Sequence, residues 1–424
     1  MTAQADQITP TKRAEPTRTP WAATAERSAT ANAEELARVT AAATRVAQEL
    51  DQDALERDRA NAEPHKEVEL LRQAGLLTLL APTEAGGGGG HWESAFQAIR
   101  IIARADASIA QLLAYHYVNQ AGIGFYAAPE DQAAWWERAV DGAWLWGDSV
   151  NPTDPDLLLT EDPAGDGWRL NGAKRFSTGS SVGEVIIVNA LVASGRRTGE
   201  VLAFVLETDR AGLSLGGDWD NLGQRLTASG SVHYDDVAVT PADVLGPVTD
   251  EPVSTLLTPG LQLAFGGFYL GVAEGALTRA RELLLGRRNS WFLSSADRYS
   301  QDPLFQAKLG RYKARISAGT ALAERIFPRF DALLSRDTEV TSEARWALAE
   351  EIAELKVVAT ETALDVTQGV FDLTGSSSTA NEVGLDRYWR NVRTHSLHDP
   401  VDYKAVEVGA YYLDGTTPPL SLYT

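Results

Sequence analysis

Ala143-Trp-Leu-Trp-Gly-Asp-Ser-Val150 marks the point at which the hydrophobic period of the chain changes. Before it, apolar residues recur at helical spacing, as at Leu36, Val39 and Val46. After it, short alternating or β-branched runs are separated by turn signals as far as about residue 239. From about residue 255 the helical spacing returns. The order α, β, α predicts an α+β protein in which a small β domain is inserted between helical domains.

This change of period divides the chain into four parts. Residues 1–31 are predicted to be a disordered tail, because prolines stand among Thr, Ala and charged residues without an apolar period. Residues 32–142 are expected to form an N-terminal α-helical domain, and residues 143–250 a central β barrel or sandwich. Residues 251–424 are expected to form a C-terminal four-helix bundle, because their helices are long.

Local signals predict where elements begin and end. Asn32 is expected to cap the first helix, with Glu35 as its partner in a capping box. Asp166-Gly167 and Asn171-Gly172 are typical hairpin turns. The other main helices are expected at roughly 64–74, 107–127, 129–140, 257–288, 301–335, 341–374, 382–398 and 400–412.

Composition excludes several classes of function. The net charge of −20 argues against a nucleic-acid partner and an anionic membrane surface, since both need a basic face. No apolar run approaches the length of a membrane span, and no signal-peptide core is visible, so we expect a cytoplasmic protein. The absence of cysteine excludes disulfides, thiolate catalysis and cysteine-ligated metals. No metal site is predicted.

Two of the six histidines, His395 and His398, stand near the C-terminus with Asp399 beside them. In a helix these imidazoles would share one face. Pro400 should end that helix, and Asp399 can then cap the next one. Histidine is well suited to proton transfer near neutral pH. An ordinary helix junction explains the same residues, so both interpretations stay open on this stretch alone.

Several motifs carry a resemblance to known proteins. Asn171-Gly-Ala-Lys-Arg-Phe-Ser-Thr178 is similar to the Asn-Gly-x-Lys-x-aromatic-x-Thr strand of the acyl-CoA dehydrogenase superfamily, and Arg387–Asn391 resembles its C-terminal Arg-Asp segment. His395-Ser-Leu-His-Asp-Pro400 resembles a narrower branch, the dibenzothiophene and alkyl sulfone monooxygenases. Further matches to this branch are Ala114-Tyr-His-Tyr-Val-Asn119, Gly217-Asp-Trp219, Gly223-Gln-Arg225 and Asp402-Tyr-Lys404. The resemblance runs from about residue 40 to the end.

The resemblance implies a two-component monooxygenase. A separate NAD(P)H:flavin reductase would supply reduced FMN by diffusion, and this protein would react it with O2. The resulting flavin hydroperoxide would oxygenate a small apolar or aromatic substrate, in the first place an organosulfur compound. No dinucleotide-binding loop is found for NAD(P)H. The element that holds an adenine half is not evident, which favours FMN over FAD. The superfamily also implies a homotetramer with flavin sites shared between subunits.

The resemblance also implies catalytic and substrate residues. His398 is the first candidate for the peroxide proton, with His395, His116 and Asp399 as further catalytic candidates. A satisfied buried histidine is the alternative for His116. Tyr115 and Asn119 would wall the substrate cavity.

Flavin contacts are implied at two places. The ring would be contacted by Phe176, Thr178, Asp148, Ser149 and Trp219. The phosphate would be contacted by Arg287 or Arg288, and by Gly375, Ser376 and Ser377 of a partner subunit. Ordinary packing for Trp219 and a solvated helix end for the arginines are the alternatives. The dibenzothiophene enzymes carry Asn at the place of Asp148 and Arg near Ser377, so these two positions depart from the branch.

Other functions remain possible on the same fold. A carboxylate such as Asp148 would favour an amine N-hydroxylase. An FAD-dependent acyl-CoA dehydrogenase needs a carboxylate that reaches the substrate carbon, and Asp399 before Pro400 is a poor replacement for the usual Glu. A non-catalytic flavin-binding protein would not need the histidine cluster.

Overall fold

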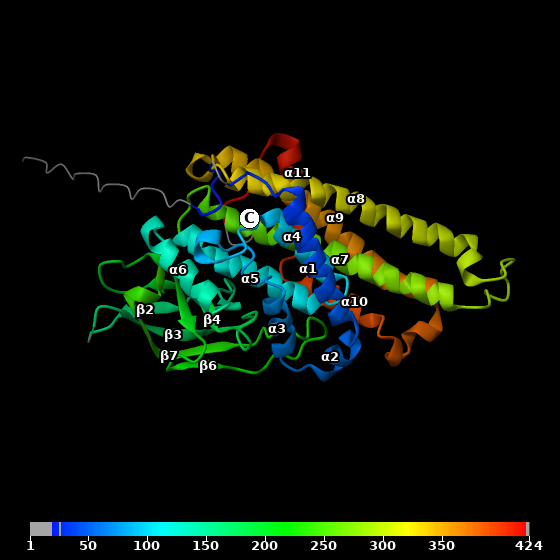
Figure 1. Cartoon of the computed structure of the whole chain (residues 1–424), viewed down its shortest axis with the longest axis horizontal. Helices are drawn as coiled ribbons and strands as arrows, with labels where there is room; N and C mark the ends of the chain where they lie inside the picture. The colour runs from blue at the N-terminus through cyan, green and yellow to red at the C-terminus, as the bar shows by residue number, and fades with distance from the viewer. Residues whose placement is uncertain (1–18, 25–26, 164, 421–423) are drawn as a thin grey trace, which may run out of the picture.

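The computed structural model describes residues 19–24, 27–163, 165–420 and 424. Helices come first, then a β-sheet, then a second set of helices, as predicted (Figure 1). The first set is α1 (Ala33–Asp51), α2 (Ala54–Ala60), α3 (His65–Gln73), α4 (Trp92–Ala103), α5 (Ala107–Tyr126) and α6 (Pro129–Asp141). The second is α7 (Leu257–Gly286), α8 (Pro303–Leu334), α9 (Ser342–Thr374), α10 (Asp386–His395) and α11 (Val401–Asp414).

Helix α5 connects the two halves of the molecule. All of its residues are buried, as expected for a helix that is hydrophobic all round. It contacts β1 on one side and α4 and α7 on the other (Figure 1). Side chains on different faces of α5 therefore reach either the sheet or the helical bundle.

The strands form one mixed sheet. They are β1 (Trp146–Ser149), β2 (Leu158–Glu161), β3 (Trp168–Lys174), β4 (Val185–Val192), β5 (Val201–Glu207), β6 (Leu213–Leu215), β7 (Val232–Val239) and β8 (Val244–Pro247). The order is β6-β7-β3-β2-β4-β5-β8, and β1 also pairs with β4 in parallel. Alternate residues of β4 serve two cores: Ile186 and Val188 pack within the sheet's own cluster, whereas Val185 and Ile187 join the helical core.

One predicted hairpin turn is wrong. Asn171-Gly172 lies inside β3, where a bulge shifts the register against β7 between Leu170 and Gly172. Gly172 adopts φ +133° there, a backbone conformation that glycine tolerates. The family motif Asn171–Thr178 is likewise a strand only as far as Lys174, and residues 175–178 form a loop. Asp166-Gly167 does lie between the antiparallel strands β2 and β3.

The C-terminal helices are centred on α7. This helix contacts α9, α4, α8 and α5. Residues Ser254–Gly286 form the one helix of the described chain that is long and apolar enough to cross a membrane, but 83% of its most apolar window is buried inside the protein. It is therefore a core helix. The predicted helices 382–398 and 400–412 are observed as α10 and α11, and α10 ends three residues earlier than expected.

Part of the predicted tail is packed on the helical domain. Trp21 is buried among Trp92, Phe125 and Trp136, and its indole N–H donates to the Leu80 carbonyl. The prediction of disorder is therefore wrong for this segment, and residues 1–18 lie outside the described part of the chain. A hydrophobic anchor in a proline-rich stretch has no periodicity by which it could be recognised.

The expected capping box at α1 is only half formed. Asn32 accepts from the Glu35 N–H at 2.9 Å. The Glu35 carboxylate instead accepts from the backbone N–H of His91 at 2.7 Å and the Ser94 hydroxyl at 2.6 Å. It thereby joins α1 to the start of α4.

Candidate active site

The two C-terminal histidines face the same side of the molecule. His395 is the last residue of α10, and His398 lies in the turn after it. Their rings are nearly parallel, with an interplanar angle of 11° and centroids 6.0 Å apart. The turn therefore brings the imidazoles together although the helix does not continue to His398.

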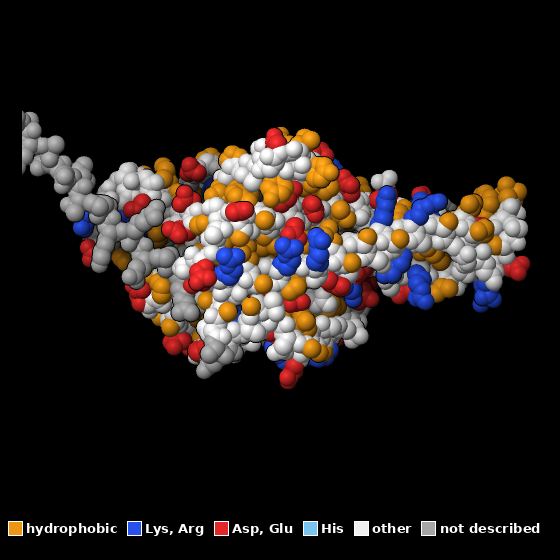
Figure 2. All heavy atoms as spheres, turned by 90° about the horizontal axis from the view of Figure 1, so that it is seen from above, with side chains coloured by type: hydrophobic (Ala, Val, Ile, Leu, Met, Phe, Trp, Pro, Cys, Tyr) orange, Lys and Arg blue, Asp and Glu red, His pale blue; other side chains and the backbone are white. Residues whose placement is uncertain are grey.

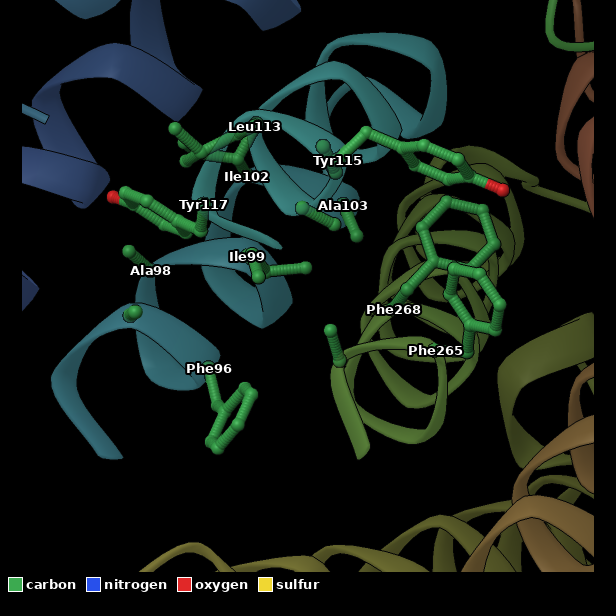
Figure 3. Packing of buried hydrophobic residues seen from close by; sticks show 14 of the residues in the cluster. Phe96, Ala98, Ile99, Ile102, Ala103, Leu113, Tyr115, Tyr117, Phe265 and Phe268 are labelled. Carbon is green, nitrogen blue, oxygen red and sulfur yellow. The ribbon is translucent and has the colours of Figure 1, made fainter. Parts of the chain in front are cut away.

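Aromatic rings from α5 and α7 surround this histidine pair. The Phe265 centroid lies 4.5 Å from that of His395 and 5.4 Å from that of His398. Tyr115 lies 5.9 Å from Phe265 and 6.3 Å from His398, and Phe268 lies 4.7 Å from His395. Figure 3 shows the Tyr115 side chain of α5 reaching toward Phe265 and Phe268 of α7. The imidazoles thus border an apolar, aromatic surface.

His395 is held as a neutral imidazole. Burial lowers its pKa well below the ordinary value, and the nearby His398 and Lys356 lower it further. Its Nδ1 is 2.7 Å from the Tyr269 hydroxyl. Its Nε2 is buried without a hydrogen-bond partner in the described structure. A neutral ring with one fixed nitrogen can offer the other to a ligand.

Asp399 holds His398 rather than capping a helix. Helix α11 begins at Val401, and no side chain caps it. Asp399 Oδ1 lies 3.3 Å from His398 Nδ1, and Oδ2 accepts from the Lys356 ammonium. Burial acts to raise the pKa of Asp399, but the His398 hydrogen bond and the Lys356 charge outweigh it and hold the pKa well below its usual range. The predicted cap is therefore wrong, and the carboxylate is an ionised partner of the imidazole.

Asp148 and Thr178 form a second polar centre where β1 meets the loop after β3. Asp148 Oδ1 accepts from the Thr178 N–H at 3.0 Å, and the Asp148 N–H donates to the Thr178 carbonyl at 3.1 Å. The Thr178 hydroxyl is 3.0 Å from that of Ser229. Burial raises the pKa of Asp148 to about 8, although the Thr178 hydrogen bond opposes this. Asp148 is thus a neutral acid at pH 7 and can donate as well as accept.

Helix α5 relates the two centres. Gln111 Nε2 lies 3.5 Å from Thr178 Oγ1, and Tyr115 contacts His398. Residues four apart on a helix share one face. The Thr178 centre and the histidine pair are therefore about one helical turn apart along α5.

His116 and Asn119 of α5 both hold the start of β1. His116 Nε2 donates to the Leu77 carbonyl at 2.7 Å, and its Nδ1 accepts from the Trp146 N–H at 3.2 Å. Asn119 Nδ2 donates to the Trp146 carbonyl at 3.2 Å. Burial lowers the pKa of His116 to about 4. With both ring nitrogens bonded to backbone, His116 fits the satisfied buried histidine, and Asn119 likewise serves the strand.

Phe176 and Trp219 lie beside the Thr178 centre. Phe176 is 56% exposed, has φ +59°, and its ring centroid is 6.2 Å from that of Trp219. An exposed aromatic ring held in this backbone conformation suits a ligand-facing surface. Ser149 is buried next to Asp148 in β1, so its side chain points to the opposite face of the strand. Its predicted contact with the cofactor is not supported by this placement.

Buried polar groups around Thr178 fit the edge of a flavin ring. Gln111 Oε1, Ser177 Oγ and both polar side-chain atoms of Gln224 are buried and lack a hydrogen-bond partner among the described residues. Buried amides normally find partners, so these groups are available to a ligand with ring carbonyls and nitrogens. Trp219 also lines a cavity of about 410 Å³ between the α2–α3 connection and the sheet.

The predicted phosphate residues gather elsewhere. Arg287 donates to Ser377 Oγ and stacks over Tyr299, with its Cζ 4.7 Å from the ring centroid. A Cβ at Gly375 would lie 3.1 Å from the Arg287 guanidinium. Arg288 is exposed. The segments after α7 (yellow-green) and α9 (orange) lie toward the bundle end away from the sheet in Figure 1. One chain does not bring them to Thr178.

Several residues of these centres were not identified from the sequence, among them Gln111, Phe268 and Ser229. Gln262, Phe265 and Tyr269 lie at helical spacing on α7, and Lys356 is a lone cation in an apolar run of α9. A charged residue among buried positions is a detectable signal. The partner of Lys356 could not be predicted from the sequence, because Asp399 is distant from it along the chain.

Comparisons with known proteins match the whole architecture. Three family models match: Acyl-CoA dehydrogenase, N-terminal domain at residues 32–143, middle domain at 150–237 and C-terminal domain at 263–403. A probable FMNH2-dependent monooxygenase, SfnC of Pseudomonas putida, is 34% identical over 91% of this chain and 97% of its own. A dibenzothiophene monooxygenase of Mycolicibacterium goodii is 34% identical over 86% and 91%. The crystal structure of FMN-bound TdsC from Paenibacillus sp. A11-2 superposes with a TM-score of 0.88 at 35% identity, covering 91% of this chain and all of that one.

Proposed function

Since the chain belongs to the acyl-CoA dehydrogenase family, and within it to the FMN-using, flavin-dependent monooxygenases of the dibenzothiophene branch, we propose that it is the oxygenating component of a two-component system for a small organosulfur compound. Reduced FMN, held by the residues around Thr178, would supply the oxygen-transfer chemistry when bound. The chain itself must bind the flavin and the substrate, exclude water from the site, and hold the proton-transferring group in place.

The observation that carries this proposal is the histidine pair against the aromatic wall. Tyr115, Phe265 and Phe268 present an apolar surface that excludes water, and His395 and His398 open onto it. Exclusion of water prevents a reactive oxygen donor from being lost unproductively. His398, held by Asp399, is the group we assign to proton transfer, whereas neutral His395 can donate or accept one hydrogen bond.

We assign the flavin ring to the polar centre around Thr178. The Thr178 hydroxyl, Gln111 and the buried Gln224 amide offer donors and acceptors, and Phe176 and Trp219 offer flat surfaces. These groups lie one turn of α5 from the aromatic wall. The chain can thus hold a flavin on one side of Tyr115 and a small apolar substrate near it.

The phosphate is assigned to a second copy of the chain, within a homotetramer. Arg287 and Ser377 are far from Thr178 within one chain, and they lie near exposed apolar residues. Figure 2 shows hydrophobic side chains at the tip of the bundle. The segment between α7 and α8 contains the exposed residues Trp291, Phe292 and Leu293. Such a patch is typical of a protein interface.

Relatives support a sulfur compound as the substrate class. The name of SfnC, a probable FMNH2-dependent monooxygenase, implies a separate supply of reduced flavin, and that of the Mycolicibacterium relative states dibenzothiophene as its substrate. For this chain we assign that supply to an NAD(P)H:flavin reductase. The amine alternative is weaker, because Asp148 is buried, neutral and bonded to the Thr178 N–H. A neutral acid does not attract an ammonium group.

The test is a single-turnover reaction. The protein is mixed anaerobically with FMNH2, and O2 is then added with dibenzothiophene or with dimethyl sulfone. We expect an oxygenated product from one of these probes, at close to one product per O2 consumed. Oxidised FMN and H2O2 alone from both probes would contradict the proposal, and product from an amine panel instead would favour the N-hydroxylase alternative.

A further inference from the structure

Lys356 occupies a position where a charge is unexpected. It lies on α9, is 1% exposed and faces α7 and the turn after α10. Its Nζ donates to Gln262 Oε1 at 2.5 Å and to Asp399 Oδ2. The same Nζ lies 5.5 Å from the Phe265 ring centroid. Lys356 therefore stands directly behind the aromatic wall.

Gln262 closes a ring with Lys356 and Asp399. Its Nε2 donates to Asp399 Oδ2 at 3.3 Å, while its Oε1 accepts from Lys356. The remaining oxygen, Asp399 Oδ1, faces His398 Nδ1 at 3.3 Å. One side of the carboxylate is thus fixed by two partners, and the other side is presented to the imidazole.

Stability alone does not account for this arrangement. The free-energy cost of desolvating two buried charges usually offsets their attraction. Apolar residues of similar volume at the same positions often stabilise the fold equally well. Burial lowers the pKa of Lys356 to about 8, which Asp399 only partly offsets. The other buried ammonium close by, that of Lys404 in α11, donates to Glu407 at 2.8 Å. The ring around Lys356 is therefore costly at a position next to the proposed chemistry.

We infer that Lys356 is a positioning residue: by holding Asp399 it fixes the orientation of the His398 imidazole toward the aromatic wall. The catalytic consequence rests on the proposed function. The structural consequence, the placement of the His398 ring, does not depend on it. Partners of this kind that orient a functional imidazole commonly change activity by about ten- to a hundredfold when removed.

The test compares Lys356→Met with a matched control, Lys404→Met, which also removes a buried ammonium. Crystal structures, FMN titration and product formed per O2 consumed are measured for each. In Lys356→Met we expect the His398 ring to leave its parallel arrangement with His395. Product per O2 should fall by about tenfold, with FMN affinity within about twofold of the wild type. Lys404→Met should lose stability only.

A His398 ring in its wild-type orientation, with wild-type product per O2, would overturn the inference. If Lys356→Met fails to fold, Gln262→Leu removes a member of the ring without deleting a charge, and the same two readouts apply. If the wild type itself oxygenates neither probe, the proposed function fails, while the crystal comparison still decides whether Lys356 positions His398.

Discussion

His395 and His398 lie three residues apart but have different surroundings. His395 is buried and bonded to Tyr269, whereas the side chain of His398 is 34% exposed and paired with Asp399. Of the two, only His398 combines a partly exposed ring with a carboxylate partner, which is the usual arrangement of a proton-transferring histidine. His116, with both nitrogens bonded to backbone, has a purely structural place.

The first prediction separates these roles. His398→Ala should leave folding and FMN binding nearly intact but uncouple O2 consumption from product, measured with an oxygen electrode and product analysis. His116→Phe should instead lose about 2 to 3 kcal/mol of unfolding free energy, because it leaves the Leu77 carbonyl and Trp146 N–H with one partner fewer. Wild-type coupling in His398→Ala would refute its assigned role.

Asp148 leads to a pH-dependent prediction. Its pKa is about 8 in the folded state, against 3.8 as the ordinary value. The stability that its bound proton contributes is fully present below the unfolded pKa and is lost as pH rises through the folded pKa, by about 1.4 kcal/mol per unit. Asp148→Asn cannot ionise, so its free energy of unfolding should decline less between about pH 5 and pH 8. The free energy of unfolding is measured against pH by urea denaturation for both proteins. The same pH dependence in both would show that Asp148 is not buried as a neutral acid.

At the scale of elements, α8 supplies the cap for α4. Asp331 of α8 accepts from the Trp92 N–H at 3.0 Å and the Glu93 N–H at 2.7 Å, the first residues of α4. Asp331→Ala should cost about 2 kcal/mol, at the upper end for a cap because the site is buried. Thr341→Ala, which removes the exposed cap of α9, should cost about half as much. Equal losses in chemical denaturation would show that the α8–α4 contact adds nothing beyond local capping.

The elements also show what could be predicted. Helices were placed well because caps, prolines and apolar spacing are local: α5 and α9 end within one residue of their expected positions. The strands were placed less well, because pairing between distant strands overrides local composition. Asn171-Gly172 has the composition of a turn, but it forms a bulge where β3 pairs with β7. Likewise, the histidine pair could be found from its motif, whereas Lys356 and Gln262 become partners of Asp399 only when α7, α9 and the turn after α10 come together.

At the scale of the whole molecule, the proposed flavin site is divided. The proposed ring contacts are around Thr178, whereas Arg287 and Ser377, which contact each other, belong to the segments after α7 and α9 that lie toward the bundle end away from the sheet (Figure 1). A closed assembly that brings the bundle tip of one chain to the Thr178 centre of another would complete a flavin site in each chain. An interface of this kind also covers the apolar tip residues Trp291 and Phe292, whose exposure is otherwise unfavourable.

Complementation between subunits tests this division. Arg287→Ala should weaken FMN binding and His398→Ala should uncouple oxygenation, so each variant alone should give little product. If each site takes Arg287 from one copy and His398 from another, mixed assemblies contain some sites with both residues intact. Random co-assembly across a two-fold interface should then restore about a quarter of wild-type product formation.

The control is a mixture of separately purified variants that do not exchange subunits. Co-expressed protein with no more activity than that mixture would place the whole site within one chain, and Arg287 would then be a residue of the bundle tip alone.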